Sequence, residues 1–402
     1  MPRLRILYVS AYWPRSRPLC GGEWRALSIG RALQNLGTVE TVVVRPGPEE
    51  STRRNGTSNE LAVTHLIEVK PRFRKGLWGK ISWAINPRIR YPYGCGADSA
   101  AAATLLKDAK DFDLVWFGNF RTPNMFENWV WPRSVLDIDD LPSSLERSNL
   151  RVATELRTRL LQMVRIHSWK GRERLLGDRF TVLTTCSDPD KVYLQKIGCK
   201  QSIHVIPNGC EHPVAEPDRR PAAPARIGFL GPFSHPPNLD GIRWFAKHCW
   251  PLIKRDIPEA RLRIVGSGSE GDLKPSGKDI DGLGWVQDLA GEIATWSVMI
   301  VPVRLGAGTR VKIAEAFSLK CPVVSTTLGA YGYDVQNGVE LLFADTATTF
   351  AEACTRMIRQ PNTATQMANR ARDQFLRNWT WDAIAPRVWA AAEDCLRLGT
   401  LR

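Results

Sequence analysis

The sequence predicts an α/β protein with two doubly wound, Rossmann-like domains. The first observation is its length of 402 residues, which exceeds what one hydrophobic core usually supports. The second is the alternation of short apolar runs with helical or loop segments, which is typical of parallel sheets covered by helices. The third is a Pro-rich, charged stretch, 207–225, that has little to bury and predicts an interdomain linker.

The apolar runs before the linker predict the strands of a first domain, 1–206. Each is too short for a buried helix and is bounded by polar or turn-forming residues. The runs are Ile6–Ser10, Thr41–Val44, Leu114–Phe117, Val135–Ile138, Val182–Thr185 and Ile203–Ile206.

A second series of runs predicts another parallel sheet in a second domain, 226–380. After it, Trp381–Leu398 has the pattern of a helix, within a final segment 381–402. The strands expected in this domain are Ile227–Leu230, Leu262–Val265, Met299–Val303, Val323–Ser325 and Leu341–Phe343.

Composition excludes several classes of protein. Nine cysteines are scattered without paired short spacing, which argues against a zinc site or a disulfide framework and favours a reducing cytosol. The first residues are too briefly apolar for a secretory signal. No uncharged apolar run of about 18 residues is present, so no membrane-spanning helix is expected.

Positive charge is concentrated in the N-terminal half. Residues 1–200 contain 32 Lys and Arg against 20 Asp and Glu, a net charge of +12 out of +14 for the chain. The densest patch, Lys70–Tyr93, has seven cations and no acid, with Phe, Trp and Tyr residues interleaved. This mixture suits an anionic membrane surface, although a solvated loop and, least favoured, single-stranded nucleic acid are alternatives.

A second basic run, Arg151–Arg179, predicts a helix. Its apolar residues favour a buried core face over contacts with a cofactor. The residues expected in the core are Leu156, Leu160, Met163, Val164 and Trp169.

The segment from Val298 to Thr326 predicts a buried strand, a glycine-rich loop, a helix and a second buried strand. The loop, Gly306-Ala307-Gly308-Thr309, leaves backbone N–H groups free at the start of a helix, where phosphate binds well. We expect Thr309 to be the N-cap. An ordinary strand-helix-strand crossover with a solvated face is the alternative.

Charged side chains on that helix strengthen the phosphate interpretation. Arg310 and Lys312 lie in the first turn, where the helix dipole disfavours cations unless an anion is bound. Glu315 follows, and its side chain leans back toward the helix start.

Several segments resemble the retaining glycosyltransferases of family 4, which have the GT-B fold of two Rossmann-like domains facing a cleft. The resemblance covers most of the chain, and the segments occur in the family's order. They are 5–37, with RILYVSAYWP at its start, HVIPNGCE (204–211), GFLGPFSHPPNLDGIRWF (228–245), 306–315, PVVST with LGAYGYDVQNGVELLFAD (322–345), and NWTWDAIAPRVW (378–389).

The resemblance implies that the first domain binds the acceptor and the second binds a nucleotide-sugar donor. Glu315 matches the family's second motif glutamate, which holds the ribose hydroxyls. Ala307 stands where the family has a first glutamate that contacts the sugar. The residues that we therefore expect at the donor site are Gly306, Ala307, Gly308, Thr309, Glu315, Arg304, Val286, His235 and Gly22.

The family often holds the pyrophosphate with an Arg and a Lys after the first strand of its donor domain. Here that segment, 231–238, contains neither. We expect Arg310 and Lys312, with Arg304, to replace them, because a diphosphate leaving group needs positive charge.

Two features of the first domain are expected to face the cleft. Gly21 and Gly22 precede a helix predicted to begin near Trp24, and they either admit a ligand close to the backbone or form a tight turn. Asp139 and Asp140 follow a predicted strand, where open α/β sheets bind ligands. Either carboxylate is a candidate to orient or deprotonate an acceptor hydroxyl, with helix capping as the alternative.

The sequence thus predicts transfer of a hexose from a nucleoside-diphosphate sugar to a lipid-linked saccharide or other glycan, with retention. We expect a cytoplasmic enzyme at the inner face of a membrane, without cofactor, bound metal or nucleic acid. A nucleotide-sugar epimerase of the same fold and a non-catalytic GT-B binding subunit are the alternatives.

Overall fold

The structure, a computed structural model, divides into two compact units. Unit 1 comprises Met1–Asn208 and Ile384–Arg402, and unit 2 comprises Gly209–Ala383. The stretch predicted as a linker, 207–225, is therefore divided after Asn208. The residues that the structure describes are 3–14, 20–46, 61, 63–69, 77–89, 109–126, 128–211, 218–271, 275 and 277–399.

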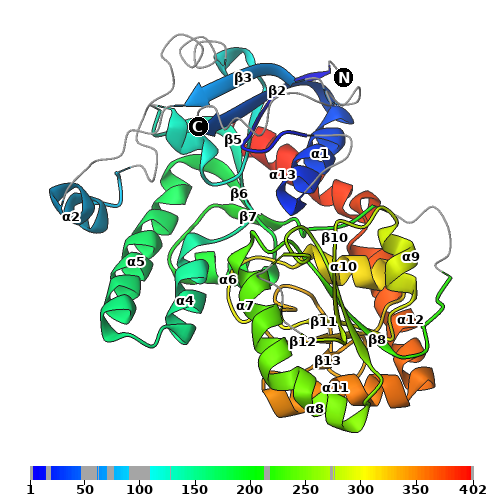
Figure 1. The fold of residues 1–402 in the computed structure, drawn as a ribbon. Helices are drawn as coiled ribbons and strands as arrows, with labels where there is room; N and C mark the ends of the chain where they lie inside the picture. Colours follow the sequence, from blue (N-terminus) through cyan, green and yellow to red (C-terminus); the bar gives the residue numbers. More distant parts are fainter. Residues whose placement is uncertain are drawn as a thin grey trace. The chain divides into compact units, whose positions relative to one another are not determined.

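Unit 1 is built on a seven-stranded parallel sheet with the order β3-β2-β1-β4-β5-β6-β7 (Figure 1). This order reverses beside β1, as in a doubly wound Rossmann-like domain. The strands are β1 (Leu4–Ser10), β2 (Gly37–Pro46), β3 (Val63–Val69), β4 (Leu114–Gly118), β5 (Trp131–Ile138), β6 (Phe180–Thr185) and β7 (Ser202–Val205). The helices are α1 (Gly21–Gln34), α2 (Leu77–Ile85), α4 (Pro142–Val152), α5 (Leu156–Arg174) and α6 (Asp188–Lys196), with short turns η2 (Ala109–Asp111), η3 (Thr122–Met125) and η4 (Leu175–Asp178).

Unit 2 repeats the plan with a six-stranded parallel sheet ordered β10-β9-β8-β11-β12-β13. Its strands are β8 (Arg226–Leu230), β9 (Arg261–Val265), β10 (Ile280–Gly284), β11 (Val298–Val301), β12 (Val323–Ser325) and β13 (Leu342–Phe343). Its helices are α7 (Pro236–Trp244), the π-helix η5 (Phe245–Cys249), α8 (Trp250–Asp256), α9 (Leu289–Ala294), α10 (Val311–Ser318), α11 (Ala347–Arg359) and α12 (Pro361–Asn378).

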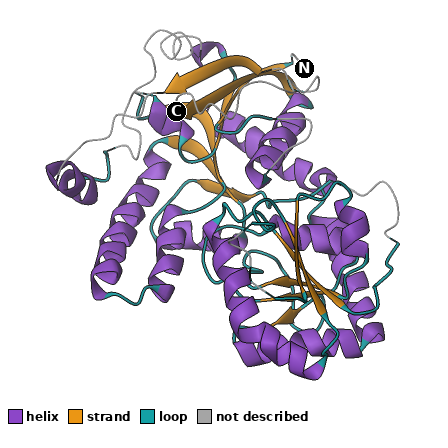
Figure 2. Cartoon of the chain, in the orientation of Figure 1, coloured by secondary structure: helices purple, strands orange, loops and turns teal. Residues whose placement is uncertain are grey.

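The unit 2 sheet is buried on both faces, as Figure 2 shows by the helices on either side of its strands. Along β11, Val298 and Ile300 pack into one hydrophobic cluster, whereas Met299 and Val301 pack into another. Because side chains alternate across a strand, a strand covered on both sides reads as a continuous apolar run. This is why β11 was predictable from the sequence.

The sequence did not reveal two edge strands, β3 and β10. Thr64, His65 and Leu66 of β3 are exposed, and the three central residues of β10, Asp281 to Leu283, are only partly buried. Edge strands need no continuous apolar run, because one side of each is not paired within the sheet.

Two helices differ from their predictions. Helix α1 begins at Gly21 rather than near Trp24, so Gly21 and Gly22 form its first turn, and Cys20 is the extended residue before it. On α5, Leu156, Leu160, Met163 and Val164 are exposed, so the expectation that they form a core face is wrong. Of the five residues predicted there, Trp169 is buried, and it packs in the main cluster of unit 1.

The C-terminal helix α13 (Trp381–Gly399) belongs to unit 1 from Ile384 onward. Trp389 Nε1 donates a hydrogen bond of 2.8 Å to the Ala32 carbonyl at the end of α1. Asp394 Oδ2 lies 3.1 Å from His204 Nε2 on β7. These contacts attach the helix to elements far away in the sequence.

We predict that Gly228→Ala destabilises unit 2 by about 1–3 kcal/mol, because inserting atoms into a packed core forces neighbours to move. A Cβ at Gly228, on the central strand β8, would lie 1.9 Å from the buried Trp296 ring. Gly271→Ala is the matched control, since its Cβ would meet nothing closer than 3.7 Å. Urea unfolding should give a lower free energy of unfolding for Gly228→Ala than for Gly271→Ala. Equal free energies would show that the Trp296 ring moves aside at little cost.

Candidate active site

The glycine-rich loop of unit 2 joins the end of β11 to α10. Gly306 and Gly308 have φ values of 112° and 71°, which side chains rarely adopt. A Cβ at Gly306 would also lie 2.8 Å from the Arg310 guanidinium and 3.4 Å from Pro237. The loop therefore depends on glycine both for its backbone shape and for its close contact with neighbouring side chains.

Arg310 closes this loop. Its Nη1 donates hydrogen bonds of 2.5 Å to the carbonyls of Ala307 and Gly308, so the guanidinium turns back onto the loop. Arg310 is also the N-cap of α10, with an extended backbone, so the prediction that Thr309 is the N-cap is wrong by one residue. The Tyr333 hydroxyl donates to the Arg310 carbonyl at 3.0 Å.

Lys312 reaches from α10 to the loop that follows β8 and to the first turn of α7. Its Nζ donates a hydrogen bond of 2.8 Å to Asn238 Oδ1 and lies 4.6 Å from the centroid of the Phe229 ring. A Cβ at Gly231 would lie 2.9 Å from this ammonium and 2.5 Å from Asn238 Nδ2. The ammonium thus occupies the place, beside Gly231, where the resemblance led us to look for pyrophosphate-binding cations.

Lys312 and Glu315 have pKa values displaced in opposite directions. Burial lowers the pKa of Lys312 to about 7, and the nearby charge of Arg310 contributes. Burial raises the pKa of Glu315 to about 7, opposed by the charge of Lys312. Pairs of side chains with such shifted pKa values are typical of ligand-binding sites, where a bound ligand of suitable charge favours the ionised form of each side chain.

His235 and Val286 extend the surroundings of α10. His235 precedes α7, and burial together with the charges of Arg310 and Lys312 lowers its pKa. Val286 follows β10 and packs against the same cluster as Ile313 and Phe317 of α10.

Arg304 is placed differently from what we expected. Its guanidinium forms a two-point ion pair with Asp240 of α7, at 2.7 and 3.1 Å, and lies 5.4 Å from the Trp244 ring centroid. We therefore assign Arg304 to bracing the loop against α7, and Lys312 remains the candidate for diphosphate binding.

A pocket of unit 1 contains two of the predicted residues, Gly22 and Asp139. Two of its lining residues, Arg25 and Asp137, make a buried two-point ion pair, at 2.6 and 2.8 Å. The lining residues are Tyr8, Ser10, Tyr12, Gly22, Arg25, Ala26, Gly118, Asn119, Asp137 and Asp139.

Asn208 connects the ion pair to Asp139. Its Oδ1 accepts a 2.9 Å bond from Arg25, and its Nδ2 donates a 2.9 Å bond to Asp139 Oδ1. Asp139 is partly exposed and Asp140 is exposed, whereas Asp137 is buried. Of the three carboxylates, Asp137 is structural, and the other two remain accessible to a ligand.

Tyr12 covers Gly22 in this pocket. A Cβ at Gly22 would lie 2.5 Å from the Tyr12 ring, so the glycine permits this close contact. Burial raises the pKa of Tyr12 to about 12, and the charge of Asp139 contributes. The hydroxyl therefore stays protonated and able to donate a hydrogen bond.

Sequence reasoning missed Arg25, Asn208 and Asn238. One signal for Arg25 was available: it is a lone cation beside Ala26 and Leu27, which implies a buried carboxylate partner. Asn238 lies 74 residues from Lys312 along the chain, so no local pattern connects them.

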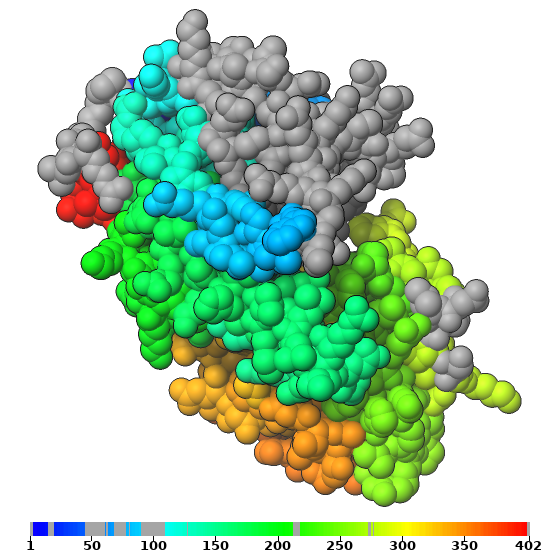
Figure 3. Space-filling view, turned by 90° about the vertical axis from the view of Figure 1, so that its left-hand side faces the viewer, coloured from blue at the N-terminus to red at the C-terminus, as the bar shows by residue number. Residues whose placement is uncertain are grey.

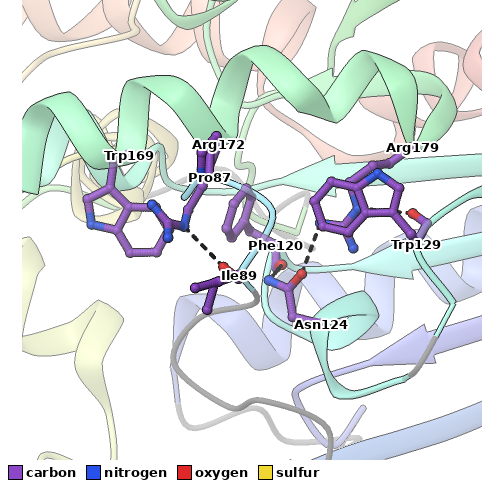
Figure 4. A pocket seen from close by; sticks show the side chains of 8 residues that line it. All are labelled: Pro87, Ile89, Phe120, Asn124, Trp129, Trp169, Arg172 and Arg179. Atoms are coloured by element: carbon purple, nitrogen blue, oxygen red, sulfur yellow. Dashed lines mark hydrogen bonds between the residues drawn. The ribbon is translucent and has the colours of Figure 1, made fainter. Parts of the chain in front are cut away.

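A second pocket of unit 1 lies beside α5 and the connection from β4 to β5 (Figure 4). Arg172 donates to the carbonyls of Trp83 at 2.6 Å and Asn86 at 3.1 Å, and so attaches the end of α2 to α5. Arg179 donates to Asn124 Oδ1 at 2.9 Å. We assign these arginines a structural role.

The described part of the chain contains no group of three or more His, Cys, Asp or Glu side chains placed to hold a metal ion. Nor does any described helix have the length and apolar character needed to cross a membrane.

Solved structures with a similar fold over nearly the whole chain include the following three. Sucrose-phosphate synthase of Thermosynechococcus elongatus has a TM-score of 0.65 and 16% identity, with 96% of this chain and 98% of that chain covered. A glycosyltransferase of Rickettsia africae has a TM-score of 0.64 and 14% identity, with 98% of this chain and 99% of that chain covered. HepE of Anabaena, in complex with UDP-glucose, has a TM-score of 0.61 and 13% identity, with 96% of this chain and 98% of that chain covered.

The sequence itself matches known proteins over shorter stretches. It is 27% identical over 134 residues to an uncharacterized 44.6 kDa protein in the cps region of Klebsiella pneumoniae. That match spans 31% of this chain and 34% of the relative, about a third of each. Residues 224–360 match the family Glycosyl transferases group 1, and this range contains the glycine-rich loop and α10.

The chain has the GT-B fold, with two Rossmann-like domains. Within this fold, residues 224–360 are similar to the group 1 glycosyltransferases.

We predict that affinity for a nucleoside diphosphate is greatest near pH 7. Above this pH, Lys312 with its pKa of about 7 loses its proton, and the diphosphate loses a cation. Below it, Glu315 with its pKa of about 7 becomes neutral and makes only a weaker bond to a hydroxyl. Calorimetric titrations from pH 5.5 to 9 should give about tenfold weaker binding per pH unit on the alkaline side.

Two conservative variants show which residue causes the loss of affinity on the alkaline side of this pH profile and which causes the loss on the acid side. Lys312→Arg should remove the alkaline limb, since guanidinium stays protonated, and Glu315→Gln should remove the acid limb. A profile unchanged in both variants would contradict the assignment.

Proposed function

We propose that this protein is a retaining glycosyltransferase of family 4. In this proposal it transfers a hexose from a nucleoside-diphosphate sugar to a lipid-linked saccharide or other glycan acceptor. It acts in polysaccharide or glycoconjugate biosynthesis.

The observation that carries the proposal is the arrangement on the first turns of α10. The Lys312 ammonium lies beside Gly231, and Glu315 lies one turn further along the same helix. An ammonium and a carboxylate at this spacing suit the diphosphate and the ribose hydroxyls of one nucleotide. Both groups are partly buried, which strengthens their interactions with a ligand.

The proposed chemistry places most of the catalytic demand on charge stabilisation. Breaking the bond between sugar and diphosphate leaves negative charge on the phosphate oxygens, where Lys312 and the backbone N–H groups of the glycine-rich loop are the stabilising groups. In the front-face mechanism implied by the resemblance, the leaving phosphate accepts the proton of the acceptor hydroxyl. Arg310 acts indirectly, because its bonds to Ala307 and Gly308 hold the loop in shape.

Asp139 is the proposed acceptor contact in unit 1. Its Oδ1 is held by Asn208 while the side chain stays partly exposed. A carboxylate held in this way orients a sugar hydroxyl by accepting its hydrogen bond. Asp140, the neighbouring exposed carboxylate, is the second candidate.

Relatives suggest where to begin the search for substrates. HepE of Anabaena was solved with UDP-glucose, so a UDP-hexose is the first donor to test. The relative in a cps region supports an acceptor in polysaccharide synthesis. Such acceptors are commonly lipid-linked, which is consistent with our expectation of peripheral association with the inner membrane face. Of the basic patch Lys70–Tyr93 that motivated that expectation, 70–76 and 90–93 lie outside the described residues.

Ala307 favours a second candidate function, a non-catalytic binding subunit. An alanine methyl group cannot replace the carboxylate that relatives use to contact the sugar. Hydrolysis of UDP-, GDP-, ADP- and TDP-sugars, with and without membrane extract, distinguishes the candidates. Turnover that requires the extract supports transfer, and binding without turnover under all conditions supports the subunit.

We predict that Glu315→Ala weakens donor binding by about 1.5–3 kcal/mol and largely abolishes transfer, because a charge-assisted bond to the ribose is lost. Isothermal titration with the donor and with its nucleoside should show losses of similar size, since both ligands contain the ribose. Glu292→Ala on α9 is a control that removes a carboxylate bonded to Arg263 instead. Near-normal affinity in folded Glu315→Ala would refute the ribose assignment.

A further inference from the structure

The first three turns of α5 have their polar and apolar faces reversed. Thr158, Gln162 and Ile166, spaced four residues apart, are the partly buried positions, and helix α4 packs against this part of α5. The larger apolar residues point outward instead. The exposed fractions are 71% for Leu156, 54% for Leu160, 52% for Leu161, 47% for Met163 and 49% for Val164.

This arrangement is unfavourable for a helix that only faces water. A helix in a soluble protein normally turns its apolar stripe toward the core and its threonine and glutamine toward solvent. Contiguous exposed apolar surface of this kind marks a site of interaction. An ion pair of Arg165 with Glu146, at 3.8 Å, joins α5 to α4.

The neighbouring helices also carry exposed apolar side chains. Leu145 and Val152 of α4 are exposed, as are Trp78 and Ile85 of α2. Helix α2 is attached to α5 by the bonds of Arg172 and by Ser168 Oγ, which donates 2.8 Å to the Ala84 carbonyl. Figure 3 shows α2 lying against the α4 and α5 region.

Exposed cations lie on the same helices as these apolar side chains. Arg151, Arg157, Arg159 and Lys170 are exposed on the two helices. The nearby acids are few: Glu146 is paired with Arg165, and Glu155 precedes α5. Glu173, at the other end of α5, is buried. The surface is therefore apolar and positively charged at once.

We propose that the outer face of α5, with α4 and α2 beside it, docks on an anionic lipid bilayer. Leucine, methionine and valine enter the interface between headgroups and acyl chains, while the arginines and the lysine meet lipid phosphates. A second copy of the chain fits this face less well, because its own cations would oppose these cations. The proposal refines the proposed membrane location, and it does not depend on the donor chemistry.

The test is sedimentation with two kinds of vesicle, one of phosphatidylglycerol and phosphatidylcholine and one of phosphatidylcholine alone. The native chain should sediment with the anionic vesicles at low salt and much less with the neutral ones. Binding should weaken with salt, because the Debye length falls from about 10 Å at 0.1 M to about 3 Å at 1 M.

Variants of exposed residues locate the docking face without disturbing a core. Leu160→Ser with Leu161→Ser and Val164→Ser should weaken binding at least about tenfold, as should Arg157→Gln with Arg159→Gln and Lys170→Gln. Controls of the same kind on other exposed sites, with two substitutions each, are Val130→Ser with Val192→Ser, and Arg220→Gln with Arg255→Gln. The controls should bind like the native chain.

Four results would overturn the proposal. The first is native protein that fails to sediment with anionic vesicles at low salt, and the second is α5 variants that bind these vesicles as their controls do. The third is a loss of vesicle binding only when Arg72, Arg74 and Lys75 are replaced by Gln. The fourth is a dimer, detected by light scattering, that only the α5 variants abolish. Nucleotide binding in solution should be equal in all variants. Vesicle binding without nucleotide binding would refute the glycosyltransferase proposal and leave the docking face in place.

Discussion

The hydrogen bond from the Lys312 ammonium to Asn238 Oδ1 fixes the geometry on which the donor site depends. It joins α10 to the start of α7, two elements that follow different strands of the unit 2 sheet. Asn238 is in turn held by the 2.9 Å bond of its backbone N–H to the His235 carbonyl, and its Nδ2 donates to Pro232. The cation therefore has a defined position beside Gly231 before any ligand arrives, which lowers the entropic cost of binding.

The same enclosure makes the site responsive to charge. A partly buried lysine whose pKa is near 7 gains from an anion both Coulomb attraction and the recovery of its proton. Glu315, with its pKa near 7, gains similarly from hydrogen-bond donors such as ribose hydroxyls. Arg310 and Arg304 provide rigidity, since their guanidinium groups are bonded to loop carbonyls and to Asp240. Among the four charged groups, two hold the loop and two are suited to the ligand.

Much of the fold was predictable from the sequence because most strands of a doubly wound sheet are buried on both faces. Runs such as Val298–Val301 and Val182–Thr185 are apolar enough to be recognised without any contact information. The edge strands β3 and β10 carry exposed or half-exposed residues and left no such signal. The glycine-rich loop was also predictable, because φ values above zero require glycine at Gly306 and Gly308.

Partnerships across the fold were not predictable. The members of the pairs Lys312–Asn238 and Arg304–Asp240 are 74 and 64 residues apart. No local pattern could therefore show that Lys312 and Arg304 have different roles. Helix α5 shows a second limit of prediction from sequence. Periodicity indicates that Leu156, Leu160 and Val164 share a side of the helix, but it does not say whether that side meets a core, water or a membrane.

The most direct test of the donor-site account is a comparison of two ligands in the Lys312→Gln variant. Isothermal titration should show that affinity for the nucleoside diphosphate falls at least tenfold, by about 1.5–3 kcal/mol, while affinity for the corresponding nucleoside stays nearly unchanged. Lys320→Gln, at a cation beyond the other end of α10, is the matched control and should leave both affinities as they are. Equal losses for the two ligands in Lys312→Gln would show that Lys312 supports the fold, and would contradict the account.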